Sequence, residues 1–275
     1  MKGKQKQLFT FAEKERMNRI VLLICSLLCT LALTGQNARA LYPGLQGEAL
    51  LQAIQAAYTP QRLLGYGEAR DVMYGKIDNL RDSVTGFYTG YRLYLPPGED
   101  PSQSLYRDGS ADGINCEHVW PRSKGAKSGN PKSDMHHLFP TRVAVNAARG
   151  NSPFAEIPDE QSEYWYAATT ELRSVPAEDI DAFSESTGEL FEPRESVKGD
   201  VARAMFYFYT IYRREALQAD PLFFQQQRAT LLLWNRLDPP SPQELSRTQA
   251  IARYQDGIPN PFVLDPTLAD RLYGF

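Results

Sequence analysis

The stretch Asn115–Pro121, with the sequence NCEHVWP, is followed closely by Ser133–Pro140 (SDMHHLFP) and Val145–Asn151 (VNAARGN). Together these segments fall within 37 residues and contain carboxylates, imidazoles, side-chain amides and several cations. All three histidines of the protein lie in this window. Because a chain otherwise without histidine gathers all of them in one place, we interpret the window as a site rather than as packing.

These side-chain types suit the hydrolysis of a phosphodiester. Oxygen ligands can hold one hard metal ion against a phosphate, and an imidazole can deprotonate a water molecule beside it. Histidine has an unperturbed pKa of about 6.5, so a useful fraction is neutral at ordinary pH and can accept a proton. The window therefore predicts metal-assisted chemistry on a phosphodiester.

Charge is unevenly distributed along the chain. The formal net charge is -3, but residues 1–40 carry seven basic and two acidic residues, so the remainder has a net charge of -8. Between His118 and Gly150 the balance reverses, with one acidic residue, Asp134, and six basic ones: Arg122, Lys124, Lys127, Lys132, Arg142 and Arg149. Although a charge run taken alone is usually a solvated face, this basic window coincides with the histidine cluster. We expect it to face phosphates on an otherwise acidic protein.

The N-terminal 40 residues have the features of a secretion signal. Residues 20–33 are apolar apart from two hydroxyl residues, and this run is shorter than the roughly 20 residues that a membrane-spanning helix needs. The small-residue pattern of a cleavage site follows at Ala38-Arg39-Ala40, and a start at Met17 would give the usual short n-region. We predict that residues 1–40 are removed and that residues 41–275 form a single nuclease domain. It would be secreted or periplasmic, without a membrane anchor, and monomeric.

Cysteine usage excludes an intramolecular disulfide in the predicted mature chain. Cys25 and Cys29 lie within the signal, which leaves Cys116 alone. We expect Cys116 to be a structural thiol beside the site, with a nucleophile as the alternative.

Hydrophobic periodicity predicts an α+β protein with a mainly helical C-terminal half. We expect helices over 49–58, 69–77, 141–149, 223–237 and from a cap at Asp200, and strands over 84–95 and 114–119. The acidic stretch 158–193 is expected to form a hairpin or loop. Ser241-Pro242-Gln243-Glu244 has the pattern of a capping box with proline at the first helical position, so a further helix should start there.

The three segments, in this order, resemble the endonuclease I family of secreted bacterial nucleases, whose core is a ββα-metal, or His-Me, finger. Similarity extends to Leu93–Pro97, Lys198–Tyr207 and the end of the chain, and it covers roughly residues 45–266. This sequence departs from the family pattern at Thr248 and at Asp256–Pro259, which puts the role of that terminal loop in doubt.

The resemblance implies a Mg²⁺-dependent, largely sequence-nonspecific endonuclease that cleaves DNA, and RNA in many members, to 5′-phosphate products. Mn²⁺ or Ca²⁺ are alternatives at the same site. Glu117 and Asn146 match the metal ligands and His118 the general base. Two oxygen ligands suit Mg²⁺, which keeps several waters. Because adjacent residues on a regular strand point to opposite faces, Glu117 and His118 can serve one site only if the strand ends or bulges there.

The remaining polar residues of the window are assigned supporting roles. We expect His136 to hydrogen-bond within the finger and orient the metal ligands, and Asp134 to cap the turn or hold His136. Phosphate contacts are expected from Arg122, Lys124, Lys127 and Arg149. A structural ion pair is the alternative for Arg149, and we expect Arg203 to be structural and Trp120 to lie in the core.

Three other functions remain open at this point. The same finger could serve an enzyme that prefers RNA, which parallel assays on plasmid and structured RNA would reveal. A nucleic-acid-binding protein without catalysis is disfavoured because Glu117, His118 and Asn146 are all present. A zinc protease needs three or four nitrogen or sulfur ligands. It would be recognised by zinc in the purified protein.

Overall fold

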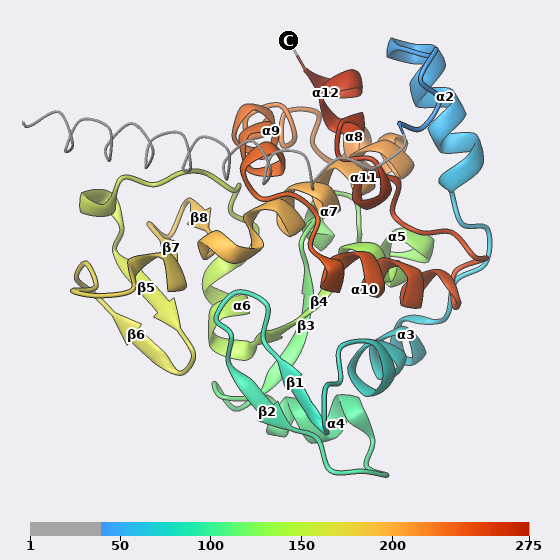
Figure 1. Cartoon of the computed structure of the whole chain (residues 1–275). Helices are drawn as coiled ribbons and strands as arrows, with labels where there is room; N and C mark the ends of the chain where they lie inside the picture. The colour runs from blue at the N-terminus through green and yellow to red at the C-terminus, as the bar shows by residue number, and fades with distance from the viewer. Residues whose placement is uncertain (1–39, 275) are drawn as a thin grey trace, which may run out of the picture. The chain divides into compact units, whose positions relative to one another are not determined.

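An antiparallel pair of strands followed by a short helix lies at the centre of the fold (Figure 1). In the computed structural model, which describes residues 40–274, β3 (Ile114–His118) pairs with β4 (Leu138–Arg142). The register runs from Ile114 opposite Arg142 to His118 opposite Leu138, and α6 (Val143–Arg149) follows directly. This is the ββα arrangement that the resemblance implied. The predicted signal segment lies outside the described residues.

The helix expected over 141–149 begins two residues later than its pattern suggested. Thr141 and Arg142 still pair with Asn115 and Ile114, so they extend β4 rather than α6. Strand β4 was not anticipated from periodicity, because its pairing with a strand about 25 residues earlier is a non-local interaction.

The strand expected over 84–95 is a hairpin instead. It consists of β1 (Ser83–Thr85) and β2 (Arg92–Tyr94), and residues 86–91 form a turn in which Gly90 has φ +67°. The turn is anchored to the finger because the Phe87 N–H donates to the Pro140 carbonyl at 2.8 Å. The hairpin therefore delivers two aromatic side chains, Phe87 and Tyr88, to the finger.

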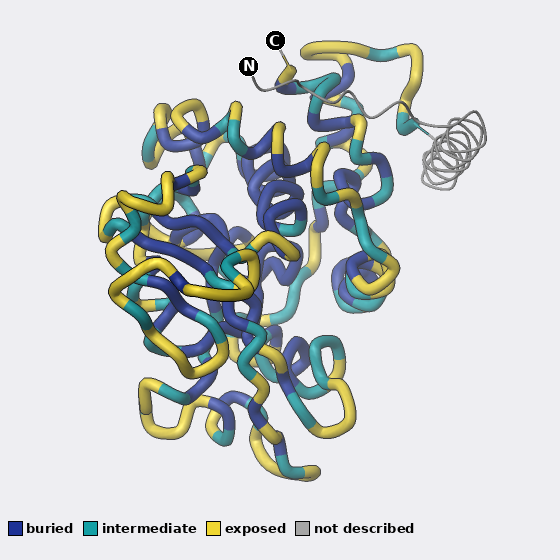
Figure 2. The backbone as a smooth tube through the Cα atoms, turned by 60° about the vertical axis from the view of Figure 1, so that its left-hand side comes forward, coloured by how far each residue is buried: buried dark blue, intermediate teal, exposed yellow. Residues whose placement is uncertain are grey.

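Helix α7 (Lys198–Ile211) is buried along nearly its whole length. A helix that is apolar on most faces must be enclosed, and α7 is packed against α9 (Arg228–Leu237) and α11 (Pro261–Leu264). Figure 2 shows the buried backbone at the centre and the exposed backbone around the edge. Trp120 is fully buried, with its ring stacked 4.8 Å from that of Phe208 on α7, so its predicted place in the core is confirmed.

Asp200 is not the cap of α7, contrary to expectation. The helix begins at Lys198, and Asp200 lies in its first turn. Its Oδ1 is 3.0 Å from Nη2 of the fully buried Arg203, so the carboxylate serves an internal ion pair, and Arg203 is structural as expected.

The acidic stretch contains a four-stranded antiparallel sheet in the order β6-β5-β7-β8, which confirms the hairpin expectation. Its strands are β5 (Tyr164–Ala167), β6 (Thr170–Leu172), β7 (Ser184–Ser186) and β8 (Phe191–Glu192). Lys198 bridges this region to α7 through its Nζ, which contacts the carboxylates of Glu156, Glu192 and Glu195. Part of the acidic charge is thus neutralised internally.

The helix start predicted at Ser241 is confirmed, because its hydroxyl accepts from the Glu244 N–H at 3.1 Å and caps α10. The capping box is only half formed, since the Glu244 carboxylate bonds to Arg203. The helix expected over 223–237 begins only at Arg228.

The other α-helices are α2 (Gly47–Tyr58), α3 (Tyr66–Val72), which continues as a π-helical turn at Met73–Ile77, α4 (Pro101–Tyr106), α5 (Gly129–Ser133), α8 (Arg213–Ala219), α10 (Pro242–Ala252) and α12 (Leu268–Tyr273). The mixed content confirms the α+β class. Within residues 40–274, no helix has the length and apolar character that crossing a membrane requires.

Candidate active site

Helix α6 lies across one face of β3 and brings three of the predicted site residues together. Asn115 and Glu117 are two apart on the strand and so share a face. Asn146 Nδ2 donates to Asn115 Oδ1 at 2.6 Å, and Arg149 Nε lies 3.0 Å from Glu117 Oε1. Because residues three apart lie on one side of a helix, α6 presents Asn146 and Arg149 to the strand side by side.

Glu117 is a buried carboxylate held from two directions. Only 3% of it is exposed, and its Oε1 accepts from the Tyr88 hydroxyl at 2.8 Å while also facing Arg149. Burial raises the pKa of Glu117, and Arg149 opposes that rise. Tyr88 and Arg149 both contact Oε1, and the His118 N–H also bonds to the carboxylate. Sequence reasoning missed Tyr88, because its place in a turn 29 residues upstream gave no local signal.

The donor atoms on this face fit a hard divalent cation. The Asn146 amide uses its nitrogen to bind Asn115, which leaves its oxygen as a ligand; this orientation follows from the hydrogen-bond network. A carboxylate oxygen and an amide oxygen are the donors that Mg²⁺ accepts while keeping several waters. The residues present therefore suit the metal that the family resemblance implies.

His118 occupies a different environment from Glu117. Its Nε2 lies 3.0 Å from the Lys132 carbonyl, which can only accept, so Nε2 carries the proton and Nδ1 keeps its lone pair. The ring lies 5.4 Å from that of Tyr66 and 5.5 Å from that of His137. Burial, with a further contribution from His137, lowers the pKa of His118 to about 3. The imidazole is thus neutral near pH 7 and has one nitrogen available as a proton acceptor.

Strand β3 ends at His118, as a shared site required, but it does not bulge. Pairing is continuous through Glu117 opposite Phe139 and His118 opposite Leu138, and the Val119 N–H still donates to the His137 carbonyl. As a result, Glu117 and His118 share no side-chain partner among the described residues. The structure groups Glu117 with Asn146 and Arg149, and it places His118 apart from them, beside His137.

Asp134 is the centre of a buried network behind the finger. It is fully buried and accepts from Tyr207 and Tyr212 hydroxyls at 2.8 and 2.7 Å and from Gln255 Nε2 at 2.8 Å. It also accepts from the His136 N–H at 3.0 Å, so it both caps the turn and holds His136, as expected.

The His136 N–H bonds to Asp134 within the finger, as expected, but the His136 imidazole has its partner outside the finger. Its Nε2 lies 2.9 Å from the carbonyl of Ile258 in the terminal loop. The loop that departs from the family pattern therefore supports the turn bearing the histidines. His137, to which no role was assigned, contacts His118 and places its Nε2 2.7 Å from the Pro131 carbonyl.

The basic window is not a continuous phosphate-facing surface. Arg149 is fully buried, donates to the Val119 carbonyl at 3.0 Å and lies over the Phe154 ring. Arg149 therefore forms the structural ion pair that was its alternative role, with Glu117 as the partner. Lys124 pairs with Asp220 at 2.8 Å, and Arg142 with Asp112 at 2.7 Å.

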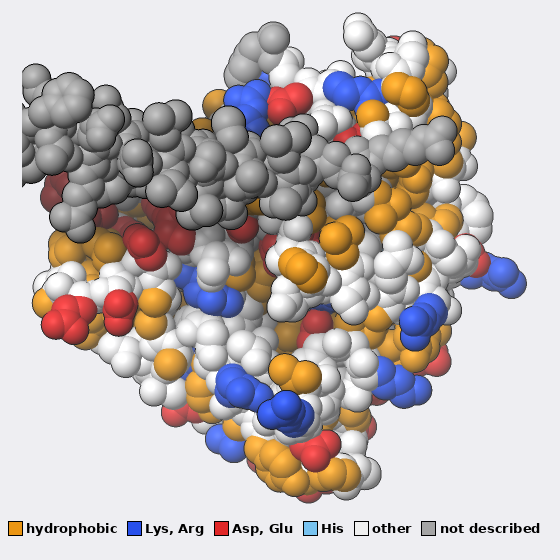
Figure 3. Space-filling view, in the orientation of Figure 1, with side chains coloured by type: hydrophobic (Ala, Val, Ile, Leu, Met, Phe, Trp, Pro, Cys, Tyr) orange, Lys and Arg blue, Asp and Glu red, His pale blue; other side chains and the backbone are white. Residues whose placement is uncertain are grey.

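Among the four expected phosphate-binding residues, Arg122 and Lys127 are exposed. Lysine and arginine side chains on the face drawn in Figure 3 lie in separate groups, several of them beside acidic side chains. Long-range attraction to a phosphate backbone therefore depends on individual exposed cations.

Replacing Arg122 and Lys127 with Ala should flatten the salt dependence of binding to duplex DNA. Each residue that neutralises a phosphate contributes about 0.9 to the slope of log affinity against log salt, so the pair should remove up to about 2 units. Binding would be measured in Ca²⁺ over a salt series. The matched control is Lys76→Ala with Arg92→Ala, two exposed cations outside the window. An equal change in the control would show that Arg122 and Lys127 form only a solvated face.

The chain is similar in sequence to known nucleases. The chain matches the family described as Endonuclease I over residues 55–267. It is 29% identical over 244 residues to an extracellular ribonuclease of Bacillus subtilis strain 168, covering 84% of this chain and 76% of that protein. It is 30% identical over 181 residues to an extracellular ribonuclease of Bacillus amyloliquefaciens, covering 60% of this chain and 55% of that protein.

The ββα arrangement and these similarities define the protein as a nuclease, an enzyme that hydrolyses phosphodiester bonds. The family match spans most of the chain. The protein belongs to the endonuclease I family.

Proposed function

We propose that this protein is an exported, Mg²⁺-dependent endonuclease that cleaves DNA and RNA with little sequence preference and leaves 5′-phosphate ends. The observation that carries the proposal is the pair of oxygen donors, from Glu117 and Asn146, on the face of β3 that α6 covers. RNA stands beside DNA as a substrate because both relatives are named extracellular ribonucleases. An enzyme that prefers RNA is the second candidate, for the same reason.

Each residue of the site has a separate task in this mechanism. Bound Mg²⁺ would polarise the phosphoryl group and stabilise the charge on the leaving oxygen. Glu117 and Asn146 would hold the ion, while Tyr88 and Arg149 fix the Glu117 carboxylate through Oε1. Because His118 lies apart from Glu117 and Asn146, the bound phosphate and the attacking water would have to span from that pair to the imidazole. There His118 Nδ1 would accept a proton from the water, and the Lys132 carbonyl keeps the other ring nitrogen protonated.

Supercoiled plasmid and structured RNA, assayed in parallel with Mg²⁺, should both be cleaved. EDTA should abolish both activities and added Mg²⁺ should restore them, because two protein ligands hold Mg²⁺ reversibly. The products should be substrates for a 5′-phosphate-dependent exonuclease. Cleavage that persists in EDTA would contradict the metal requirement. Cleavage of RNA alone would establish the RNA-preferring alternative.

Export should remove residues 1–40. The exported protein should then begin at Leu41 and contain a single titratable thiol, Cys116. N-terminal sequencing and thiol titration of protein from the culture medium or periplasm check both points. Retention of the apolar segment would show a membrane-attached enzyme instead.

A further inference from the structure

Two cations lie over the ring of Tyr66, the first residue of α3. Arg70, one turn along that helix, has its Cζ 4.9 Å from the ring centroid, and Lys132 of α5 has its Nζ 4.7 Å from the same point. The two positive charges are therefore separated by no more than the sum of these distances. Like charges this close to each other repel, so an anion bound by both would stabilise the arrangement.

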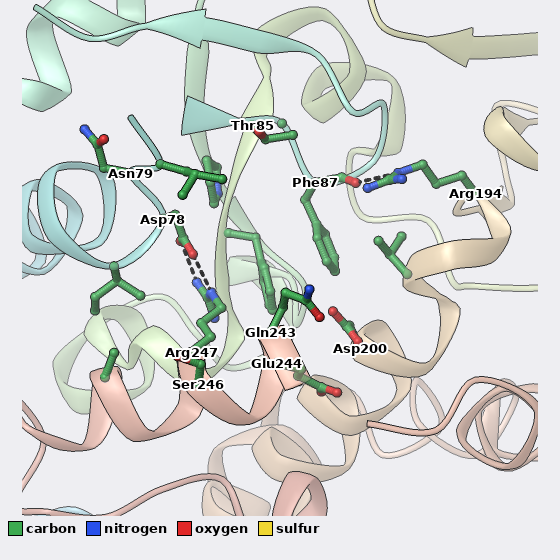
Figure 4. Close-up of a pocket in the computed structure, with 17 residues that line it drawn as sticks. Asp78, Asn79, Thr85, Phe87, Arg194, Asp200, Gln243, Glu244, Ser246 and Arg247 are labelled. Carbon is green, nitrogen blue, oxygen red and sulfur yellow. Dashed lines mark hydrogen bonds and ion pairs between the residues drawn. The ribbon is translucent and has the colours of Figure 1, made fainter. Parts of the chain in front are cut away.

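Neither cation has an acidic partner. Within residues 40–274 the Arg70 guanidinium and the Lys132 ammonium form no ion pair and no hydrogen bond, and Arg70 Nε is buried without a partner. Arg247, by contrast, is paired with Asp78 at 2.7 Å, as Figure 4 shows. A buried donor that no acceptor satisfies is uncommon, and a bound ion is one explanation for it. The unpaired state of Arg70 and Lys132 therefore points to an anionic ligand.

These two cations lie beside the proposed base. The Tyr66 ring centroid is 5.4 Å from that of His118, and the Lys132 carbonyl accepts from His118 Nε2 at 3.0 Å. Burial is the largest cause of the lowered pKa of His118, and the charges of Arg122 and Lys132 add to it. Lys132 thus fixes the imidazole through its backbone and places a positive charge near it through its side chain.

The cations and the proposed metal ligands lie on different faces of β3. Glu117 and His118 are adjacent on a regularly paired strand, so their side chains point to opposite faces. Ile114 shares the face of His118, and Tyr66 packs against the buried cluster that contains Ile114. Since β3 ends at His118, the metal ligands and the cations flank the end of β3 from its two faces.

A phosphate group suits these two side chains. The planar guanidinium of arginine can bind two phosphate oxygens at once, and lysine binds phosphate as a point charge. Arg70 and Lys132 are both half-buried, so a ligand can reach them from solvent. Salt screens partly buried charges less than exposed ones. A nucleic acid carries such a phosphate at every nucleotide.

We propose that Arg70 and Lys132 bind a backbone phosphate of the substrate beside His118, next along the backbone to the phosphate at the proposed metal site. Held at both faces of β3, the backbone crosses the end of β3, and the bond to be cleaved lies between the Glu117 and Asn146 pair and the imidazole. Contacts to phosphate carry no base information, which agrees with little sequence preference. This inference rests on the proposed function, because it supplies the contact that brings the substrate across to His118.

Binding of a short single-stranded DNA oligonucleotide in EDTA tests this contact without metal or cleavage. Each phosphate neutralised on a single strand adds about 0.7 to the slope of log affinity against log salt, so Arg70→Gln with Lys132→Gln should flatten the slope by about 0.7. At low salt this variant should bind about tenfold or more weakly, because it loses charge-assisted hydrogen bonds. Its backbone carbonyl at position 132 still accepts from His118.

Lys76→Gln with Arg92→Gln is the matched control. It removes the same charge from two exposed positions and should keep the wild-type slope. Arg70→Lys keeps the positive charge and should retain most of the affinity, whereas a role of Arg70 in packing alone would make it no better than Arg70→Gln. Thermal unfolding shows which variants are folded.

An unchanged slope in the folded double variant, or an equal fall in the control, would overturn the inference. If the double variant does not fold, Lys132→Glu alone decides: weaker binding supports the phosphate contact, and unchanged binding overturns it.

Cleavage in Mg²⁺ separates this inference from the proposed function. If the wild-type protein cleaves and the double variant binds with an unchanged slope, the phosphate contact is wrong and the proposed function stands. If the double variant flattens the slope and the wild-type protein does not cleave, the phosphate contact stands and the proposed function is wrong.

Discussion

His118→Ala should lower the rate of nucleic-acid cleavage by about 10²–10⁴-fold, the usual contribution of a positioned acid–base group. The imidazole donates through Nε2 to the Lys132 carbonyl, so Nδ1 is the nitrogen that can take a proton from water. Because burial keeps the ring neutral near pH 7, the base needs no prior deprotonation. Removing it should affect the chemical step and leave substrate binding in place.

His118→Gln sharpens this test. Glutamine can still donate a hydrogen bond to the Lys132 carbonyl but has no basic nitrogen, so it should be as inactive as alanine. Single-turnover rates would be measured beside binding in Ca²⁺ and thermal unfolding. Either variant retaining more than about a tenth of the wild-type kcat, while folded, would remove His118 from the role of base.

Glu117→Ala should have two large effects, one on metal binding and one on stability. It removes the charged metal ligand, so the Mg²⁺ concentration needed for activity should rise more than in Asn146→Ala, which loses a neutral ligand. It also leaves Arg149 fully buried without its carboxylate. Breaking one side of a buried ion pair costs about 3–5 kcal/mol, so the melting temperature should fall.

Double variants separate these effects. Glu117→Gln keeps an acceptor for Tyr88, so combining it with Asn146→Ala tests whether the two share one ion. The double variant should be little worse than Glu117→Gln, because ligands of one metal act as a unit. Strictly additive losses would argue against a shared ion.

The contribution of the Glu117–Arg149 ion pair to stability is measured by the free energy of unfolding. Glu117→Ala with Arg149→Met should recover part of the stability lost in Glu117→Ala, because the unpaired charge has gone. Tyr88→Phe is the milder counterpart: it removes one hydrogen bond to Oε1 and should raise the Mg²⁺ requirement modestly through the orientation of Glu117. If Glu117→Ala left the stability unchanged, Arg149 could not be the buried partner described above.

Several features were predictable from sequence because they are local. The N-cap at Ser241 works within four residues, and α2 follows from apolar spacing along one turn after another. The α+β class belongs with them. Even β3 was located, although the partner strand β4 was not.

Only the tertiary structure decided which groups the charged and aromatic side chains contact. Lys124 is paired with Asp220, 96 residues away, and His136 faces the Ile258 carbonyl, 122 residues away. Tyr88 reaches Glu117 only because a turn is anchored to β4. Local patterning determines which residues are helical or extended and which faces are apolar. It contains no information on which distant group will neutralise a buried charge, so the ion pair of Arg149 with Glu117 became visible only once α6 lay across β3.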